Sequence, residues 1–167
     1  EGFGSWVRDT CHAAFRCQNL LAPDEARESL SYISEHGFNN GVDCAAMPAI
    51  AAWDHYITTG DIQLLYEMLP GIIKYAEEAD ARYDEEMQLV HATMCLAQDA
   101  FEEPENGGYC LGTEIAFALM YQDVASICEV TGCYPERIKF WESRSKEMLA
   151  SIKEKYWNEE KECFTSG

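Results

Sequence analysis

The 167-residue sequence is poor in basic residues and lacks long apolar runs. Its 12 Lys and Arg stand against 30 Asp and Glu, which leaves a formal net charge of −18. A charge of that sign repels nucleic acid and anionic lipid headgroups, so we expect neither as a partner. No apolar run approaches membrane-spanning length, and the amino terminus lacks the basic and then apolar pattern of a signal peptide. A neutral or cationic partner is therefore expected.

Neither a C-x-x-C nor an H-x-x-x-H pair occurs, so a structural zinc site is not expected, and no cofactor is predicted. The eight cysteines, which also lack a tight repeated spacing, are Cys11, Cys17, Cys44, Cys95, Cys110, Cys128, Cys133 and Cys163. Most fall on apolar faces of predicted helices, where a free Cys packs as a small hydrophobic residue. We therefore expect reduced thiols and a cytoplasmic location, with disulfide pairing as the alternative.

The apolar content of 47% is enough to fill the core of one domain over residues 1–167. The chain does not begin with Met, and residues 2–6 resemble the interior of an active-site loop. Residues 163–167 end equally abruptly. We expect this domain to be a piece of a longer polypeptide.

Apolar residues at helical spacing, bounded by Pro and Gly, predict six helices over residues 9–21, 24–37, 44–59, 62–82, 113–131 and 136–157. The first is expected to bury a stripe of Ala13, Ala14, Cys17, Leu20 and Leu21. Asp24 is expected to cap the second helix.

The third and fifth predicted helices are nearly devoid of charge, which is typical of helices buried on all sides. Pro48 is expected in the first turn of the third helix, where it breaks no hydrogen bond. The fourth and sixth helices are amphipathic, and Thr59-Gly60-Asp61 and Thr131-Gly132-Cys133 occupy matching turns. A buried helix, a turn and an amphipathic helix thus recur about three times. This alternation predicts an all-α fold of two concentric layers, an (α/α)₆ toroid with about three of six hairpins present.

In such a toroid the amino-terminal ends of the inner helices converge at one mouth. Trp6, Arg8 and Asp9 precede the first helix and offer a plane on which a sugar can stack, a donor fork and an acceptor pair. A simpler alternative is that Asp9 caps the helix and Arg8 pairs with it.

The stretch Trp6-Val7-Arg8-Asp9-Thr10 resembles the Trp-x-Arg-Asp-Ser/Thr motif of glucoamylases, glycogen-debranching amylo-α-1,6-glucosidases and exo-α-mannosidases. Asp43-Cys44-Ala45-Ala46-Met47-Pro48, followed by Trp53 and Thr59-Gly60, is similar to the Asp-Ser-x-x-x-Pro, aromatic, Thr-Gly stretch of the exo-mannosidases. The resemblance implies an (α/α)₆ glycoside hydrolase in which Trp6, Arg8, Asp9 and Asp43 bind the terminal sugar.

Relatives of this kind place their general acid on the loop before the third inner helix, often as Asp-Ala, and Asp99-Ala100 is the matching pair. Apolar neighbours could raise the pKa of that carboxyl by desolvation. Glu102 or Glu103 is the alternative acid.

Glu114, at the start of the fifth helix, loosely matches a Glu of the debranching-type relatives. This match implies that Glu114 binds a sugar hydroxyl or supports the residues that bind the sugar. A carboxylate that simply favours the positive helix end is the other interpretation.

The resemblance implies release of a terminal sugar from an α-linked oligosaccharide or polysaccharide with inversion, which needs a second carboxylate as the base. No residue of this sequence corresponds to that base, so the remaining half of the barrel, from the same polypeptide, is expected to supply it. The chain alone is expected to be inactive. A carbohydrate-binding relative without catalysis and a structural helical module are the alternatives.

Overall fold

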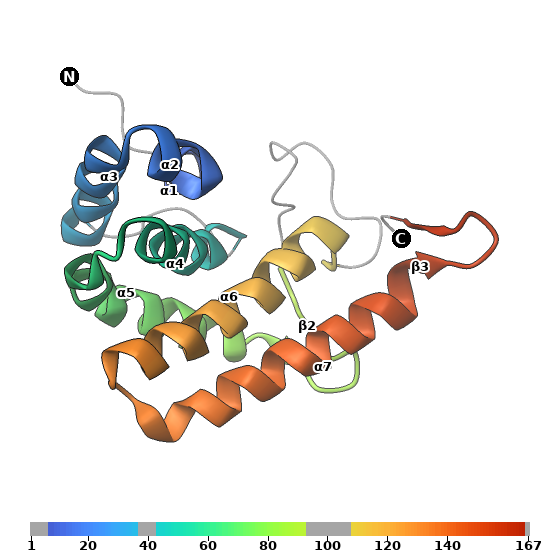
Figure 1. Cartoon of the computed structure of the whole chain (residues 1–167). Helices are drawn as coiled ribbons and strands as arrows, with labels where there is room; N and C mark the ends of the chain where they lie inside the picture. Colours follow the sequence, from blue (N-terminus) through green and yellow to red (C-terminus); the bar gives the residue numbers. More distant parts are fainter. Residues whose placement is uncertain (1–6, 37–42, 93–107, 166–167) are drawn as a thin grey trace.

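The computed structural model describes residues 7–36, 43–92 and 108–165, without the side chains of Asp43 and Cys44. Its α-helices are α1 (Val7–Ala13), α2 (Asn19–Leu21), α3 (Pro23–His36), α4 (Met47–Thr59), α5 (Ile62–Asp80), α6 (Leu111–Thr131) and α7 (Ile138–Tyr156) (Figure 1). Shorter helical turns are η1 (Ala14–Gln18), η2 (Asp43–Ala46) and η3 (Pro135–Arg137). Two antiparallel pairs join β1 (Tyr83–Asp84) to β2 (Leu89–Val90) and β3 (Trp157–Asn158) to β4 (Cys163–Phe164). The predicted all-α fold of helical hairpins is confirmed.

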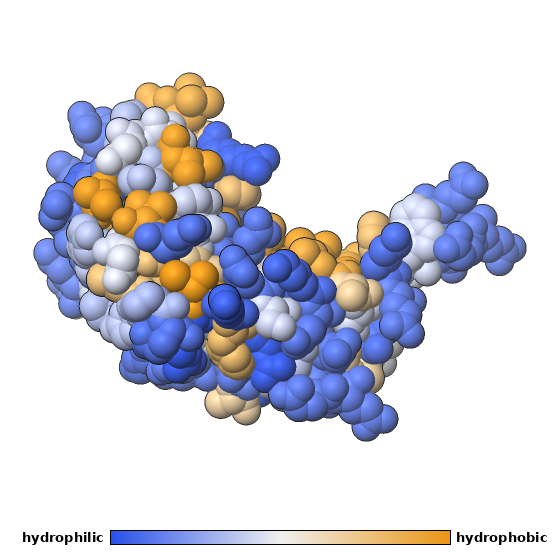
Figure 2. Space-filling view, turned by 60° about the horizontal axis from the view of Figure 1, so that its bottom comes forward, coloured by the Kyte–Doolittle hydropathy of each residue, from blue (hydrophilic) through white to orange (hydrophobic). Residues whose placement is uncertain are grey.

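The hairpins α4–α5 and α6–α7 lie side by side, with α6 packed against α4, α5 and α7 (Figure 1). On its other side α4 packs against α1 and α3. Residues 47–52 of α4 are all buried, together with Asp54 and His55, as its lack of charge predicts. Pro48 lies in the first turn of α4, which is also as predicted. The face seen in Figure 2 is largely hydrophilic, with apolar residues in small separate patches.

The two hairpins turn in the same way. Gly60 and Gly132 have φ angles of 78° and 69°, a left-handed conformation that glycine adopts without steric cost. After the first turn, Asp61 caps α5 by accepting hydrogen bonds from the backbone N–H groups of Gln63 and Leu64. The turns therefore match in structure as they do in sequence.

The first predicted helix is interrupted, and the stripe assigned to it is wrong. Phe15 and Arg16 leave helical geometry, and Arg16 has a φ of 57°. The helical phase is reset at this kink, so Leu20 and Leu21 are 68% and 78% exposed. Ala13 and Cys17 are exposed as well, whereas Ala14 is buried.

Smaller corrections concern helix ends and strands. Helix α2 ends at Leu21, just before Pro23, and Pro23 itself begins α3, so Asp24 lies inside the first turn and is not the cap. The strands β1 to β4 were not predicted because pairs of two residues carry no readable alternation.

The cysteines depart in part from the expectation of reduced thiols. Cys11 and Cys128 are free and buried, as a small hydrophobic residue would be, and Cys17, Cys133 and Cys163 are also free. Cys110, just before α6, is disulfide-bonded. Within the described residues, no helix is long and apolar enough to cross a bilayer.

Candidate functional site

The amino-terminal ends, or heads, of α4 and α6 lie close to one another in the described part of the chain. Helix α1 packs against α4, and the turn η2, which begins at Asp43, contacts α6. Since α6 follows α4 in the same direction along the hairpin repeat, both helices begin on the same side of the molecule (Figure 1). This is the side on which the sequence predicts the mouth.

Arg8 and Asp9 are neighbours at the start of α1. The Arg8 Nε atom lies 3.5 Å from the Asp9 Oδ1 atom, and the Asp9 side chain is 60% exposed. Asp9 is the third residue of α1, so it does not occupy the cap position that precedes the helix. Its ion pair with Arg8 is present, and most of its carboxylate is open to solvent.

Several of the predicted site residues lie outside the described residues. They are Trp6, Asp99, Glu102 and Glu103, together with the side chain of Asp43. Of the predicted ligands, Arg8, Asp9 and Glu114 can therefore be placed by their side chains.

The connection before α6 starts and ends at one place. The Ala92 N–H group donates a 3.0 Å hydrogen bond to the Gly108 carbonyl, which joins the two ends of residues 93–107. His91 packs edge-on against Tyr109, with ring centroids 5.6 Å apart. Gly108 has a φ of 104°, and a Cβ atom there would lie 2.5 Å from His91 Nε2, so only glycine fits. The segment that carries Asp99 in the sequence thus leaves from, and returns to, the head of α6.

Glu114 is fully buried at this place. Its Oε2 atom accepts a 3.0 Å hydrogen bond from the Val90 N–H group, and its Oε1 atom has no partner among the described residues. Burial disfavours the charged form and raises the pKa of Glu114 to about 8, although the Val90 hydrogen bond acts in the opposite direction. The carboxyl is therefore mainly protonated at neutral pH, which argues against a simple carboxylate at the positive end of the helix.

Three phenols lie around this carboxyl: Tyr109, Tyr121 of α6 and Tyr156 of α7. Desolvation raises the pKa of Tyr109 and of Tyr156 to about 12 each, and raises that of Tyr121 as well. The Glu114 carboxylate contributes to all three shifts. The Tyr109 hydroxyl donates a 2.9 Å hydrogen bond to Asp84 Oδ2 in β1. These phenols are uncharged at neutral pH, so they do not offset the charge of an ionised Glu114.

Arg144 of α7 fastens the β1–β2 hairpin. Its guanidinium donates 2.8 Å hydrogen bonds to Asp80 and Glu85 and stacks 3.6 Å from the Tyr83 ring centroid. The Ser151 hydroxyl adds a 2.7 Å hydrogen bond to the Met87 carbonyl. The hairpin is thereby held to α7 on one side and to α6 on the other.

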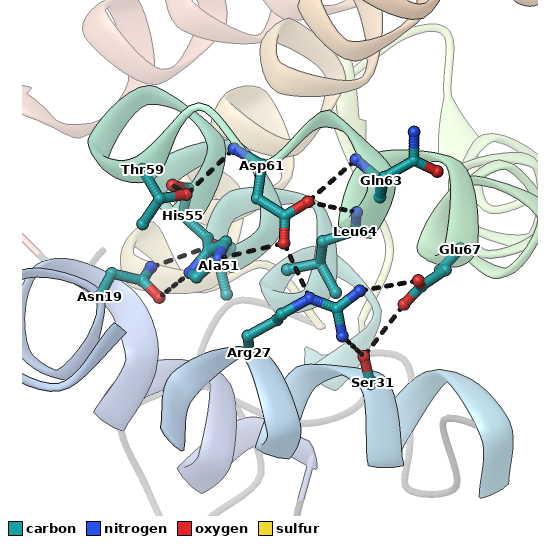
Figure 3. Close-up of polar contacts among 10 residues, drawn as sticks. All are labelled: Asn19, Arg27, Ser31, Ala51, His55, Thr59, Asp61, Gln63, Leu64 and Glu67. Atoms are coloured by element: carbon teal, nitrogen blue, oxygen red, sulfur yellow. Dashed lines mark hydrogen bonds and ion pairs between the residues drawn. The ribbon is translucent and has the colours of Figure 1, made fainter. Parts of the chain in front are cut away.

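A second polar cluster, which the sequence analysis missed, lies at the far end of α4 (Figure 3). Asn19 donates to Asp54 at 2.9 Å and to the Ala51 carbonyl at 3.2 Å, and it pairs with His55 Nδ1 at 3.0 Å. The Arg16 N–H group also donates to Asp54, at 2.8 Å. Burial lowers the pKa of His55, so the ring is neutral at neutral pH. The available sequence signal for this cluster was the pair Asp54 and His55, which are polar residues inside a helix predicted to be apolar.

The same cluster extends to the surface through Arg27. Its guanidinium forms 2.8 Å contacts with Asp61 and Glu67, and so ties α3 to the N-cap and the second turn of α5 (Figure 3). These contacts satisfy one another and lie away from the helix heads. We assign the cluster to holding α2 and α3 against α4 and α5.

A cavity of about 380 Å³ lies between α6 and α7. Its lining residues are Gln122, Ala125, Ser126, Glu129, Glu142, Ser145, Lys146 and Leu149. Among the described side chains, no three His, Cys, Asp or Glu residues lie close enough together to hold a metal ion.

No family model matches the chain, and no curated protein matches it. A solved structure does: the GH78 family rhamnosidase of Bacillus sp. GL1 aligns with a TM-score of 0.72 at 13% sequence identity. The alignment covers 96% of this chain and 18% of the rhamnosidase chain. At such low identity the likeness shows the fold alone, which is a helical arrangement shared with part of a glycoside hydrolase.

Proposed function

We propose that the chain is part of a glycoside hydrolase that releases a terminal sugar from an oligosaccharide or polysaccharide. The observation that carries this proposal is the structural likeness to a rhamnosidase over 96% of the chain. The motifs at the helix heads support the same class independently, because they resemble the sugar-binding motifs of other (α/α)₆ glycosidases. On that resemblance we further propose an α-linked substrate and inversion at the anomeric carbon.

In this proposal Arg8 and Asp9 bind hydroxyl groups of the terminal sugar, with Trp6 as the stacking plane and Asp43 as a further ligand. The open Asp9 carboxylate supports that role, since a ligand can reach it. Asp99 protonates the leaving oxygen, with Glu102 or Glu103 as the alternative acid. The residues 93–107 that contain these acids are joined at the head of α6, beside the other inner helix.

One flank of α6 supports the expectation that further helices of the same polypeptide complete the barrel. Helix α4 packs against α1 and α3 as well as α5 and α6, and its residues 47–52 are all buried. Helix α6 is of similar composition but exposes Ile115, Leu119 and Val130 to between 37% and 38%. These residues share one face, and Leu149 of α7 is 44% exposed nearby, at the rim of the α6–α7 cavity. A further hairpin packed there would cover them as α6 covers α4, and would bring the base.

The test is a sugar-release assay of the longer polypeptide against nitrophenyl glycosides, rhamnosides included, and α-linked oligosaccharides. The proposal predicts hydrolysis of at least one α-glycoside, and none by the 167-residue chain alone. Sugar binding without hydrolysis would establish the carbohydrate-binding alternative. If the longer polypeptide neither binds nor hydrolyses any sugar of the panel, the structural helical module is the remaining alternative.

A further inference from the structure

Glu114 and the β1–β2 hairpin form a unit whose geometry goes beyond the proposed roles of the sugar ligands. The side chain of Glu114 is fully buried, so a sugar reaches it only if the surrounding residues move. Its one described hydrogen bond is to Val90, in the strand that leads into residues 93–107. Glu114 therefore acts on a backbone segment.

We propose that Glu114 is a positioning residue: an uncharged carboxylic acid that latches Val90, and with it the joined ends Ala92 and Gly108, to the head of α6. The part that this latch plays in catalysis rests on the proposed function, because the latched segment is the one that carries Asp99. The latch itself does not depend on any sugar chemistry.

Burial, and not the hydrogen bond itself, favours the uncharged form of Glu114. Among the described residues, the groups that face Glu114 are Val90 from β2, Tyr109 from the segment before α6, Tyr121 from α6 and Tyr156 from α7, and none of these four carries a positive charge. His91, which follows Val90, packs against Tyr109. Arg144 is the cation that fastens the same hairpin, but its contacts are to Asp80, Glu85 and Glu147. Among the described residues, an ionised Glu114 would have one hydrogen bond and no ion partner, and its Oε1 atom would have no partner. The buried charge is relieved when the hairpin lifts and water enters.

Hydrogen exchange of the Val90 and Ala92 amides in the protein tests the latch, with protection factors corrected for intrinsic exchange. The pKa of Glu114 is about 8 while it is buried and returns toward its ordinary value when the hairpin opens, so wild-type protection should fall as pH rises to about 8 and then level off, by roughly thirtyfold between pH about 6.5 and about 9. Glu114→Gln keeps an acceptor oxygen but cannot ionise, and its protection should stay constant within about twofold. Glu114→Leu should show low protection at both pH values, because the acceptor is gone.

Two controls isolate the residue. Glu86→Gln removes one exposed charge from the same hairpin and should behave as the wild type does. Asp123 also has a raised pKa, about 7, but it is present in every variant and cancels in the comparison. Parallel pH dependence in wild type and Glu114→Gln, or full protection in Glu114→Leu, would overturn the proposal. Neither result would bear on whether the longer polypeptide cleaves sugars.

Discussion

At the scale of single residues, Glu114 links burial to pH. Its pKa in the folded chain is about 8, against 4.5 for an unperturbed Glu. As pH rises between these values, the unfolded chain loses the proton while the folded chain keeps it, so the free energy of unfolding falls. Above about 8 the full cost of the buried charge is present. This is the reverse of an ion-paired carboxylate, which stabilises a protein as pH rises.

Glu114→Gln should remove this dependence. Because the Gln side chain does not ionise, the stability of the variant relative to wild type should improve by on the order of 3 kcal/mol between pH about 5.5 and about 8. Urea unfolding of both proteins at several pH values measures the difference, and Asp123 contributes equally to each. A difference that stays constant with pH would show that Glu114 is ionised throughout.

The place of Glu114 at a helix head could be predicted from the sequence, whereas its protonation state could not. Burial depends on β2, Tyr109 and α7 surrounding the same point, and none of these is adjacent to Glu114 in the sequence. The Asn19–Asp54–His55 cluster was missed for the same reason, since its members are 35 or 36 residues apart.

Among the elements, Arg144 contributes more to stability than an exposed surface charge would. Its side chain is 13% exposed, and it joins α5, the β1–β2 hairpin and α7. Arg144→Met keeps much of the packing but leaves Asp80 without its 2.8 Å partner. We expect a loss of about 2–3 kcal/mol in unfolding free energy.

Lys146→Met is the matched control for Arg144, because Lys146 lies on the same helix, is 77% exposed and only meets Glu142 at 3.9 Å. Its loss should stay below about 0.5 kcal/mol. Equal losses for the two variants, measured by thermal or urea unfolding, would contradict the assignment of Arg144 as the residue that fastens the β1–β2 hairpin.

Helical periodicity predicted the hairpins because α4 and α6 bury nearly every face and their turns are marked by Gly60 and Gly132. It failed at the first helix, where Arg16 takes a left-handed φ and redirects the chain. The Arg16 N–H group, freed from the helix, bonds to Asp54 in α4. A contact 38 residues away thus overrides the local helical preference, and a sequence pattern carries no sign of it.

In the molecule as a whole, one face of α6 leaves Ile115, Leu119 and Val130 partly exposed. If further helices of the longer polypeptide pack on α6, Leu119→Glu should place a charge in that interface and lower the unfolding free energy of the longer polypeptide by about 2–4 kcal/mol. Leu20→Glu, at a position 68% exposed on α2, should cost less than about 0.5 kcal/mol. If Leu119→Glu is as harmless as Leu20→Glu, the exposed face of α6 is not an interface in that polypeptide.

The proposed glycosidase site at the helix heads needs a general acid, and Asp99→Asn in the longer polypeptide tests whether Asp99 is that acid. On the glycoside that the panel identifies, kcat/KM should fall by about a thousandfold or more, since the amide cannot protonate the leaving oxygen. Glu35→Gln, which removes an exposed charge at the end of α3, should leave kcat/KM unchanged. Hydrolysis by Asp99→Asn at the wild-type rate would contradict the account.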